Sequence, residues 1–254
     1  MDGNLDLTEF FRSWKYDADN QVRIVKAEDG REVLQIRQPL GVEQYELDGR
    51  PDGVTPEGRP SYLDVYKDAL ERHVEENGSE VGFVIDHEAF LSLQNEGVLN
   101  YYRYLVLFQI GDFERTARDT GQNLALCEMV EKHAESEEDK KEILQYKPYI
   151  LRMHAISEAM LSLHRQLKTA ARHILESAIE QIEKMSPIDT PAFQFERLRS
   201  LNYLRSTLKQ VLEQKVSPLD RLKGELEAAL EEENYEQAAD LRDRIRALKK
   251  EFEV

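Results

Sequence analysis

Cysteine, glycine, proline and long apolar runs are all scarce in this chain of 254 residues. The single cysteine, Cys127, excludes an internal disulfide and a cysteine-based zinc site, and it suits a reducing compartment. Many of the few glycines and prolines lie in residues 49–60, so most of the chain meets few obstacles to helix formation. Apolar runs such as residues 105–108 are far too short to span a membrane.

An excess of positive charge is also missing. Fifty acidic residues face 34 basic ones, which gives a net charge of −16 and a pI near 4.9. Such a surface repels phosphates and anionic lipids, so we expect no membrane association, and direct nucleic-acid binding is disfavoured. The first residues, MDGNLDLTEF, lack the basic and apolar regions of a secretion signal. We therefore expect a cytoplasmic protein.

The spacing patterns of catalytic and metal sites are absent from the sequence. Its six histidines form no His-x-x-x-His pair, and residues 49–60 have neither the Walker nor the Gly-x-Gly-x-x-Gly spacing. Cys127 lies in an apolar helical pattern and is interpreted as a buried small residue rather than a nucleophile. Asp86, beside His87, is interpreted as a helix cap. We expect no enzymatic activity, no metal and no cofactor.

Residues 1–60 favour a small β-structure preceded by an aromatic segment. Asp29-Gly30 stands between two runs of alternating apolar and polar residues, a strong β-hairpin signal, and residues 42–47 can add a third strand. Residues 49–60 are expected to be a linker or a long loop. The aromatic segment should form one or two helical turns that pack on the body, and a docking peptide is the alternative. Its aromatic residues are Phe10, Phe11, Trp14 and Tyr16.

Residues 61–217 predict a helical body. Ser61 and Gly78 are start and stop signals of one helix. Two more helices are expected at about 86–110, where Gly97 could break or bend the helix, and at 113–134. Apolar residues at steps of three and four predict one long helix over about 143–185 and another from about 192. The segment GDFERTARD (residues 111–119) resembles the inter-helix turn of a tetratricopeptide unit, in which Gly ends one helix and Asp, here Asp112, caps the next. No period of about 34 residues is present.

Residues 218–254 predict an antiparallel pair of helices. Apolar residues at steps of three and four form the inner seam of the first helix. Residues 231–234 form the turn, where Asn234 can cap the second helix or take positive φ. The first arm ends acidic and the second is basic, which favours antiparallel pairing. The seam residues are Leu219, Leu222, Leu226 and Leu230, then Ala238, Leu241 (or Arg242), Ile245, Leu248 and Phe252. The fold class is thus mainly α: a multi-helix bundle of antiparallel helical hairpins, with a small N-terminal β-hairpin or meander and a C-terminal two-helix hairpin.

The stretch from Asn234 to Ile245, NYEQAADLRDRI, resembles the UvrB/UvrC (UVR) motif, whose signature is aromatic-Glu-x-Ala-Ala-x-x-Arg-Asp-x-Ile. Tyr235 stands where the family most often has Phe, and Ala229 where Met is common. The resemblance implies a bacterial-type protein-docking module. In that family the motif joins UvrB to UvrC, and similar segments occur in McsA-type adaptors of protein-arginine kinases and in ClpC-type unfoldases. The nuclease, helicase and Cys-x-x-Cys motifs of these proteins are missing here.

The resemblance leads us to expect a non-catalytic adaptor or scaffold that docks a UvrB/UvrC-like protein, a Clp-like protein or a second copy of itself. Packing of the hairpin on the protein's own helices is the structural alternative. Functional alternatives are an accessory factor of nucleotide excision repair, a regulator of Clp-type proteolysis or of a protein-arginine kinase, and an enzyme hidden in the helical body. A DNA-repair role would need a basic patch around Arg197, Arg199 and Arg205.

The expected contact residues come from both arms of the hairpin. We expect Arg242 and Asp243 to set the register with the partner, and Glu236 to cap the second helix or to pair with a basic arm of the partner. The full predicted set is Leu226, Leu230, Tyr235, Glu236, Ala238, Ala239, Leu241, Arg242, Asp243 and Ile245.

Overall fold

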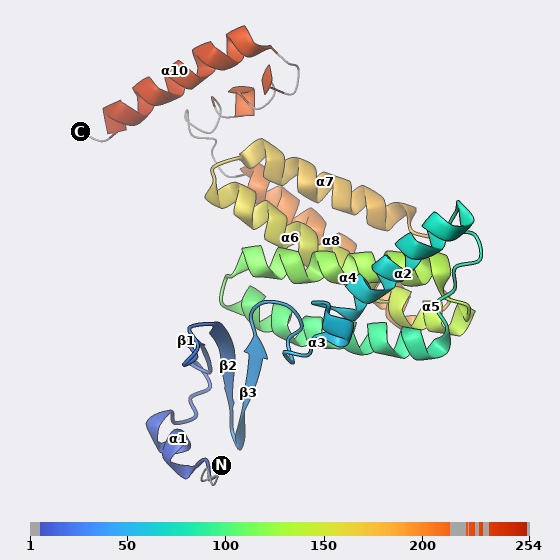
Figure 1. Ribbon diagram of the computed structural model, residues 1–254. Helices are drawn as coiled ribbons and strands as arrows, with labels where there is room; N and C mark the ends of the chain where they lie inside the picture. The colour runs from blue at the N-terminus through green and yellow to red at the C-terminus, as the bar shows by residue number, and fades with distance from the viewer. Residues whose placement is uncertain (1–5, 214–221, 223, 227–228, 231–233, 253–254) are drawn as a thin grey trace.

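The computed structural model describes residues 6–213, 222, 224–226, 229–230 and 234–252, with the side chains of α10 described as far as residue 246. The protein is mainly α-helical with one small antiparallel sheet, which confirms the predicted fold class (Figure 1). The helices are α1 (Thr8–Ser13), α2 (Tyr62–Asn77), α3 (His87–Gln109), α4 (Phe113–His133), α5 (Glu137–Leu144), α6 (Lys147–His164), α7 (Lys168–Lys184), α8 (Pro191–Glu213) and α10 (Tyr235–Phe252).

The sheet is a three-stranded meander, with the strand order β1 (Val22–Lys26), β2 (Glu32–Gln38) and β3 (Gly41–Glu46). Gly30 lies in the β1–β2 turn with φ of +88°, a conformation that favours glycine. The antiparallel pairing of β1 with β2 and of β2 with β3 confirms the predicted hairpin and third strand. Leu34 on the central strand packs with Leu47 and with Leu107 of α3. The helices therefore cover the apolar face that an isolated meander would expose.

The N-terminal aromatic segment packs on this sheet, as predicted for a short helix against the body. The guanidinium carbon of Arg23 lies 3.8 Å from the Trp14 ring centroid, and that of Arg37 lies 4.2 Å from the Phe11 ring centroid. Arg37 Nε also donates a 2.9 Å hydrogen bond to the Trp14 carbonyl. Cation–π contacts thus attach α1 to β1 and β2.

Side-chain caps begin the helices where the sequence predicted them. Ser61 Oγ accepts a hydrogen bond from the Asp64 amide at the start of α2, and Asp86 Oδ1 accepts one from the Ala89 amide at the start of α3. Asp112 caps α4 in the same way. Gly97 lies inside α3, which runs without a break from residue 87 to residue 109. Ser136 caps α5, whose first turn holds the acidic residues Glu137, Glu138 and Asp139.

The long helix predicted over 143–185 is wrong, because this region forms the end of α5 and two helices, α6 and α7. At the end of α6 the Leu167 amide donates to the Ser162 carbonyl and the Gln166 amide donates to the Leu163 carbonyl. This pattern is a Schellman motif, and Gln166 takes the left-handed conformation at φ of +63°. Glycine normally occupies the left-handed position at such a helix end. Because Gln166 stands there instead, the sequence gives no signal of the break between α6 and α7.

The end of α3 has the same hydrogen-bond pattern with glycine in the left-handed position, which provides a matched pair of variants. Gly111 has φ of +78°, and an added Cβ there would meet no atom within 4 Å. The left-handed conformation is unfavourable for a residue with a Cβ. Gln166→Gly should therefore stabilise the protein by about 0.5–1 kcal/mol, and Gly111→Gln should destabilise it by about 1 kcal/mol. Urea denaturation measures both changes in the free energy of unfolding. Equal effects of the same sign would contradict this account of the α6–α7 break.

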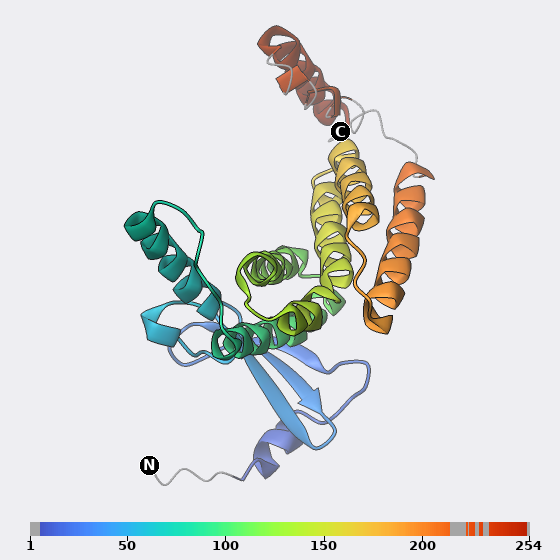
Figure 2. The same cartoon turned by 90° about the vertical axis from the view of Figure 1, so that its right-hand side faces the viewer.

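The helical body is a series of neighbouring antiparallel helices (Figures 1 and 2). Helix α4 packs on α3 and on α6, and α6, α7 and α8 pack on one another. One buried apolar cluster joins α6, α7 and α8, and it is made of residues such as Ala171, Leu175, Ile182 and Leu204. A second cluster joins α2, α3 and α4 through Leu63, Phe90, Leu93 and Val130. Helix α4 therefore connects the α2–α3 side of the body to the α6–α8 side.

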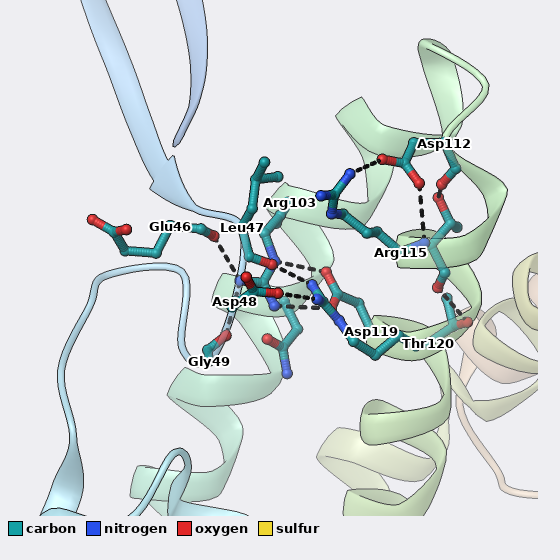
Figure 3. A network of polar contacts seen from close by, with 12 residues as sticks. Glu46, Leu47, Asp48, Gly49, Arg103, Asp112, Arg115, Asp119 and Thr120 are labelled. Carbon is teal, nitrogen blue, oxygen red and sulfur yellow. Dashed lines mark hydrogen bonds and ion pairs between the residues drawn. The ribbon is translucent and has the colours of Figure 1, made fainter. Parts of the chain in front are cut away.

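A buried arginine on α3 joins the sheet to the helical body (Figure 3). Arg103 donates from Nε and Nη2 to the two carboxylate oxygens of Asp119 on α4, at 2.7 and 2.8 Å. Its Nη1 donates at 2.7 Å to the carbonyl of Glu46, the last residue of β3, and at 2.8 Å to the carbonyl of Gly49 in the turn that follows. Both charged side chains are almost completely buried. One side chain therefore holds α3, α4 and the end of the sheet together.

Arg118 extends this network to the protein surface. Its Nε donates to Asp119 Oδ1 at 3.0 Å, and its Nη1 lies 2.9 Å from Asp48 Oδ1. It also donates to the Leu47 carbonyl. The Asp119 carboxylate thus receives hydrogen bonds from two guanidinium groups, which compensates its removal from water.

A second buried ion pair orders residues 49–60, which form a long loop rather than a linker. Arg50 Nη1 lies 3.0 Å from Glu96 Oε2, and both side chains are 3% exposed. The Glu96 carboxylate also accepts hydrogen bonds from the amides of Tyr62 and Leu63, at 2.6 and 3.1 Å. Both amides belong to the first turn of α2 and therefore have no hydrogen-bond acceptor within the helix. The helix dipole also favours a negative charge at this end. Glu96 on α3 therefore fixes both the loop and the start of α2.

The Arg103→Met variant should be strongly destabilised, by about 3–5 kcal/mol, because it leaves the Asp119 carboxylate buried without its main cation and two carbonyls without a donor. The free energy of unfolding from urea denaturation measures this. Arg12→Met is the control, since Arg12 pairs with Glu9 on the exposed surface of α1, and it should change stability little. Similar stabilities of the two variants would contradict the assigned role of Arg103.

Candidate protein-binding site

The C-terminal hairpin is closed by Asn234, directly before α10. The Asn234 amide donates a 2.8 Å hydrogen bond to the Ala229 carbonyl, and its Oδ1 accepts a 3.2 Å bond from the Gln237 amide. The second of these bonds is an N-cap, so Asn234 takes the capping role that was one of its two predictions. The described residues of the first arm, 222, 224–226 and 229–230, are helical. The predicted turn residues 231–233 lie outside the described part of the chain.

The inner seam of the hairpin is apolar but differs from the prediction at one position. Ala229, Ala238 and Leu241 form a buried cluster against which Leu222 and Leu226 pack, and Ile245 is also buried. Leu230 is 51% exposed, so its predicted place in the seam is wrong. The neighbouring Ala229 is turned inward instead, and two facing alanines, Ala229 and Ala238, let the arms approach closely. The seam positions Leu219, Leu248 and Phe252 lie outside the described side chains.

The outer surface of α10 carries most of the other predicted contact residues. Tyr235 is 69% exposed, and Ala239 and Arg242 are exposed as well. With Arg246 these residues follow steps of four, three and four, which places them on one face of the helix. We call Tyr235, Ala239, Arg242 and Arg246 the outer stripe. Glu236 and Asp243 are exposed beside it.

The predicted contact set therefore divides into two structural groups. Ala238, Leu241 and Ile245 are buried in the seam, and Leu226 is half-buried against it. The other six are exposed: Leu230, Tyr235, Glu236, Ala239, Arg242 and Asp243. Members of the first group hold the arms together, and members of the second are open to contact with another molecule.

Helix α10 stands beyond one end of α6 and α7, far from the sheet (Figures 1 and 2). The first arm approaches the body at Gly224, where an added Cβ would lie 2.8 Å from Thr169 Oγ1 near the start of α7. The buried cluster of the hairpin consists of its own residues and is separate from the cluster of α6, α7 and α8. The hairpin thus has its own small core next to the end of the body.

Cys127, His154 and His87, which lie outside the hairpin, contact neighbouring helices of the body. Cys127 is 1% exposed, and burial raises the pKa of its thiol to about 12, so it is protonated at neutral pH. His154 Nδ1 lies 3.1 Å from the Ala117 carbonyl oxygen and 3.0 Å from Thr120 Oγ1, between α6 and α4. His87 Nδ1 lies 3.1 Å from the Asp139 carboxylate. Among the described residues, no helix is long and apolar enough to cross a bilayer, and no group of three metal-ligating side chains lies together.

The fold and the site define a mainly helical protein with an appended two-helix hairpin of independent core. Residues 217–251 match the family model of the UvrB/uvrC motif (UVR), which confirms the resemblance seen in the sequence. The match covers the hairpin and leaves the sheet and the helical body outside it. No curated protein and no solved structure matches the chain.

Two aspartate variants on α10 should separate the seam from the outer surface. Leu241 is 2% exposed, so Leu241→Asp places a charge in the seam and should unfold this marginal hairpin. Hydrogen exchange of the amides of residues 238–246 should then accelerate by about tenfold or more. Ala239→Asp introduces the same side chain on the exposed face and should leave exchange almost unchanged. Equal acceleration in both variants would contradict the assignment of the seam.

Proposed function

We propose that this protein is a non-catalytic adaptor or scaffold of the cytoplasm that docks a protein partner through its C-terminal UVR hairpin. The observation that carries the proposal is the outer stripe of α10, where Tyr235 is 69% exposed. An aromatic ring beside Ala239 and two arginines offers a contact area, a site for close approach and positive charge on one helical face. Aromatic and arginine side chains dominate the energetics of protein interfaces.

The division of labour within the hairpin also supports docking. The apolar contacts of the seam are made by the hairpin's own residues Ala229, Ala238 and Leu241. The two arms can therefore stay paired while the outer stripe contacts another chain. Leu230, which is 51% exposed and lies five residues before Tyr235, adds exposed apolar area at the end of the first arm. A UvrB/UvrC-like protein, a Clp-like protein and a second copy of this chain are the partners that the motif suggests.

The DNA-repair alternative finds less support in the helical body. Arg197 donates to the carbonyls of Ile182 and Glu183 at the end of α7. Arg199 Nη1 lies 3.6 Å from Glu196 Oε1, and Arg205 Nη2 lies 2.6 Å from Glu183 Oε1. Each arginine of the predicted basic patch therefore has an acidic or carbonyl partner, which lowers the positive potential available to a phosphate backbone.

A pull-down with matched variants tests the proposal. The intact protein, a version cut after Ser217 and the double variant Tyr235→Asp/Ala239→Glu are compared in native lysate by mass spectrometry. The truncation and the double variant should lose the same partners, with the double variant retaining less than about a tenth of each, because it removes an aromatic anchor and adds negative charge. Thermal unfolding of the helical body should be unchanged, because both substituted residues are exposed.

The control is Arg244→Glu, which changes the net charge by the same two units on the opposite face of α10. Arg244 is exposed and contacts Asp240 at 3.8 Å. This variant should keep the partners that the double variant loses. Retention of all partners by the double variant, or equal losses in the control, would overturn docking through the outer stripe. Excision-repair proteins, an arginine kinase or an unfoldase among the lost partners would identify the pathway.

A further inference from the structure

The helical body contains a cavity of about 460 Å³, separate from the hairpin, that no pattern in the sequence predicted. It lies between α3, α4, α5, α6 and α8, and five tyrosines line it. Tyr104 is fully buried, whereas Tyr102 and Tyr146 are half-exposed. Its size falls in the range of about 300–1,000 Å³ that is usual for small-molecule sites. We call it the tyrosine cavity, after Tyr101, Tyr102, Tyr104, Tyr146 and Tyr149.

The tyrosine rings contact one another at steep angles. The Tyr101 ring centroid lies 5.6 Å from that of Tyr104 and 6.0 Å from that of Tyr149, with interplanar angles of 87° and 65°. Edge-to-face packing holds these rings in fixed orientations. Walls of this kind favour a flat aromatic ligand, which can stack on one ring and meet the edge of another. Aliphatic residues, among them Val98, Leu126 and Ile143, complete the lining.

A group of buried polar atoms adjoins the cavity where α6 meets α8. Glu196 lines the cavity, and its Oε2 lies 3.9 Å from Arg152 Nη2, which is too long for a hydrogen bond. Within the described residues, Glu196 Oε2, Arg152 Nη1 and Ser200 Oγ have no hydrogen-bond partner. Arg152 is 4% exposed, and its guanidinium carbon lies 4.8 Å from the ring centroid of Tyr149. Buried atoms of this kind normally have partners, so this group is incomplete.

The chemistry of the incomplete group selects the ligand. Glu196 Oε2 needs a hydrogen-bond donor, and the nearby Arg152 Nη1 needs an acceptor. The charges at this side of the cavity already sum to zero, because the carboxylates of Glu196 and Glu142 are matched by the guanidinium groups of Arg152 and Arg199. Glu142 also accepts a 2.7 Å hydrogen bond from Gln94. A ligand with a large net charge would upset this balance. A neutral ring with a donor next to an acceptor on one edge matches both the walls and the polar atoms.

We propose that the tyrosine cavity binds a small, uncharged aromatic molecule whose edge carries adjacent donor and acceptor groups, the pattern of a nucleobase or of an aromatic carboxamide. The ring packs against the tyrosines, and the polar edge meets Glu196, which separates the cavity from Arg152. Because Glu196 both lines the cavity and faces Arg152, it is the residue through which the ligand contacts the buried group. This site does not involve the hairpin and is independent of partner docking.

Saturation-transfer NMR and calorimetry on the full chain test this proposal with adenosine, uridine, nicotinamide and benzamide. Methyl benzoate, which keeps the ring and the acceptor but has no donor, is the matched ligand control. Benzamide should bind at least about tenfold more tightly than methyl benzoate, because a site with buried polar groups discriminates against a ligand that leaves one unpaired. Tighter binding of the nucleosides would assign a nucleobase, and tighter binding of nicotinamide a carboxamide.

Two protein variants locate the binding. Tyr102→Ala removes a half-exposed wall residue and should weaken binding about tenfold. Glu196→Gln should selectively reduce the advantage of benzamide over methyl benzoate. Tyr235→Ala, in the hairpin, should leave the affinity unchanged. The proposal is overturned if none of the four probes binds at millimolar concentration, if methyl benzoate binds as well as benzamide, or if Tyr102→Ala has no more effect than Tyr235→Ala.

Discussion

The buried ion pair between Arg103 and Asp119 is the constraint on which the arrangement of this protein depends. The three-stranded meander needs a cover for its apolar face, so it must stay attached to the helices that provide this cover. Arg103 provides this attachment, because its guanidinium group binds α4 together with two carbonyls, one at the end of β3 and one in the turn after it. Arg50 and Glu96 repeat the principle at the start of α2. Burying such charges is unfavourable unless they are fully hydrogen-bonded, so each pair selects one geometry of the elements that it joins.

The body and the hairpin represent two levels of stability in one chain. The body has large apolar clusters that several helices share, whereas the hairpin relies on a short seam of alanines and leucines. A small seam leaves the hairpin close to the limit of independent stability. The same small size leaves Tyr235 and the adjacent arginines on the outside. An exposed face on a marginal module is well suited to gaining stability when a partner binds.

The two proposed sites use different parts of the molecule for different kinds of recognition. The outer stripe is convex and exposed, which suits a protein surface. The tyrosine cavity is concave and has incomplete polar groups on its α6–α8 side, which suits a small molecule. An acidic protein with a net charge of −16 can carry both functions without attracting nucleic acid over its average surface.

The sequence alone determined the features that depend on neighbouring residues. Asp29-Gly30 predicted the hairpin, Ser61, Asp86 and Asp112 predicted helix starts, and the segment around Tyr235 and Ala238 predicted the UVR motif, because turns, caps and short motifs act over a few residues. Tertiary structure decided the rest. The helix break at Gln166 lacks the glycine that would indicate it in the sequence. Whether Ala229 or Leu230 faces the seam depends on how closely the second arm of the hairpin approaches the first. The Arg103–Asp119 pair and the tyrosine cavity join residues from separate helices, and no local pattern encodes which distant side chains will meet.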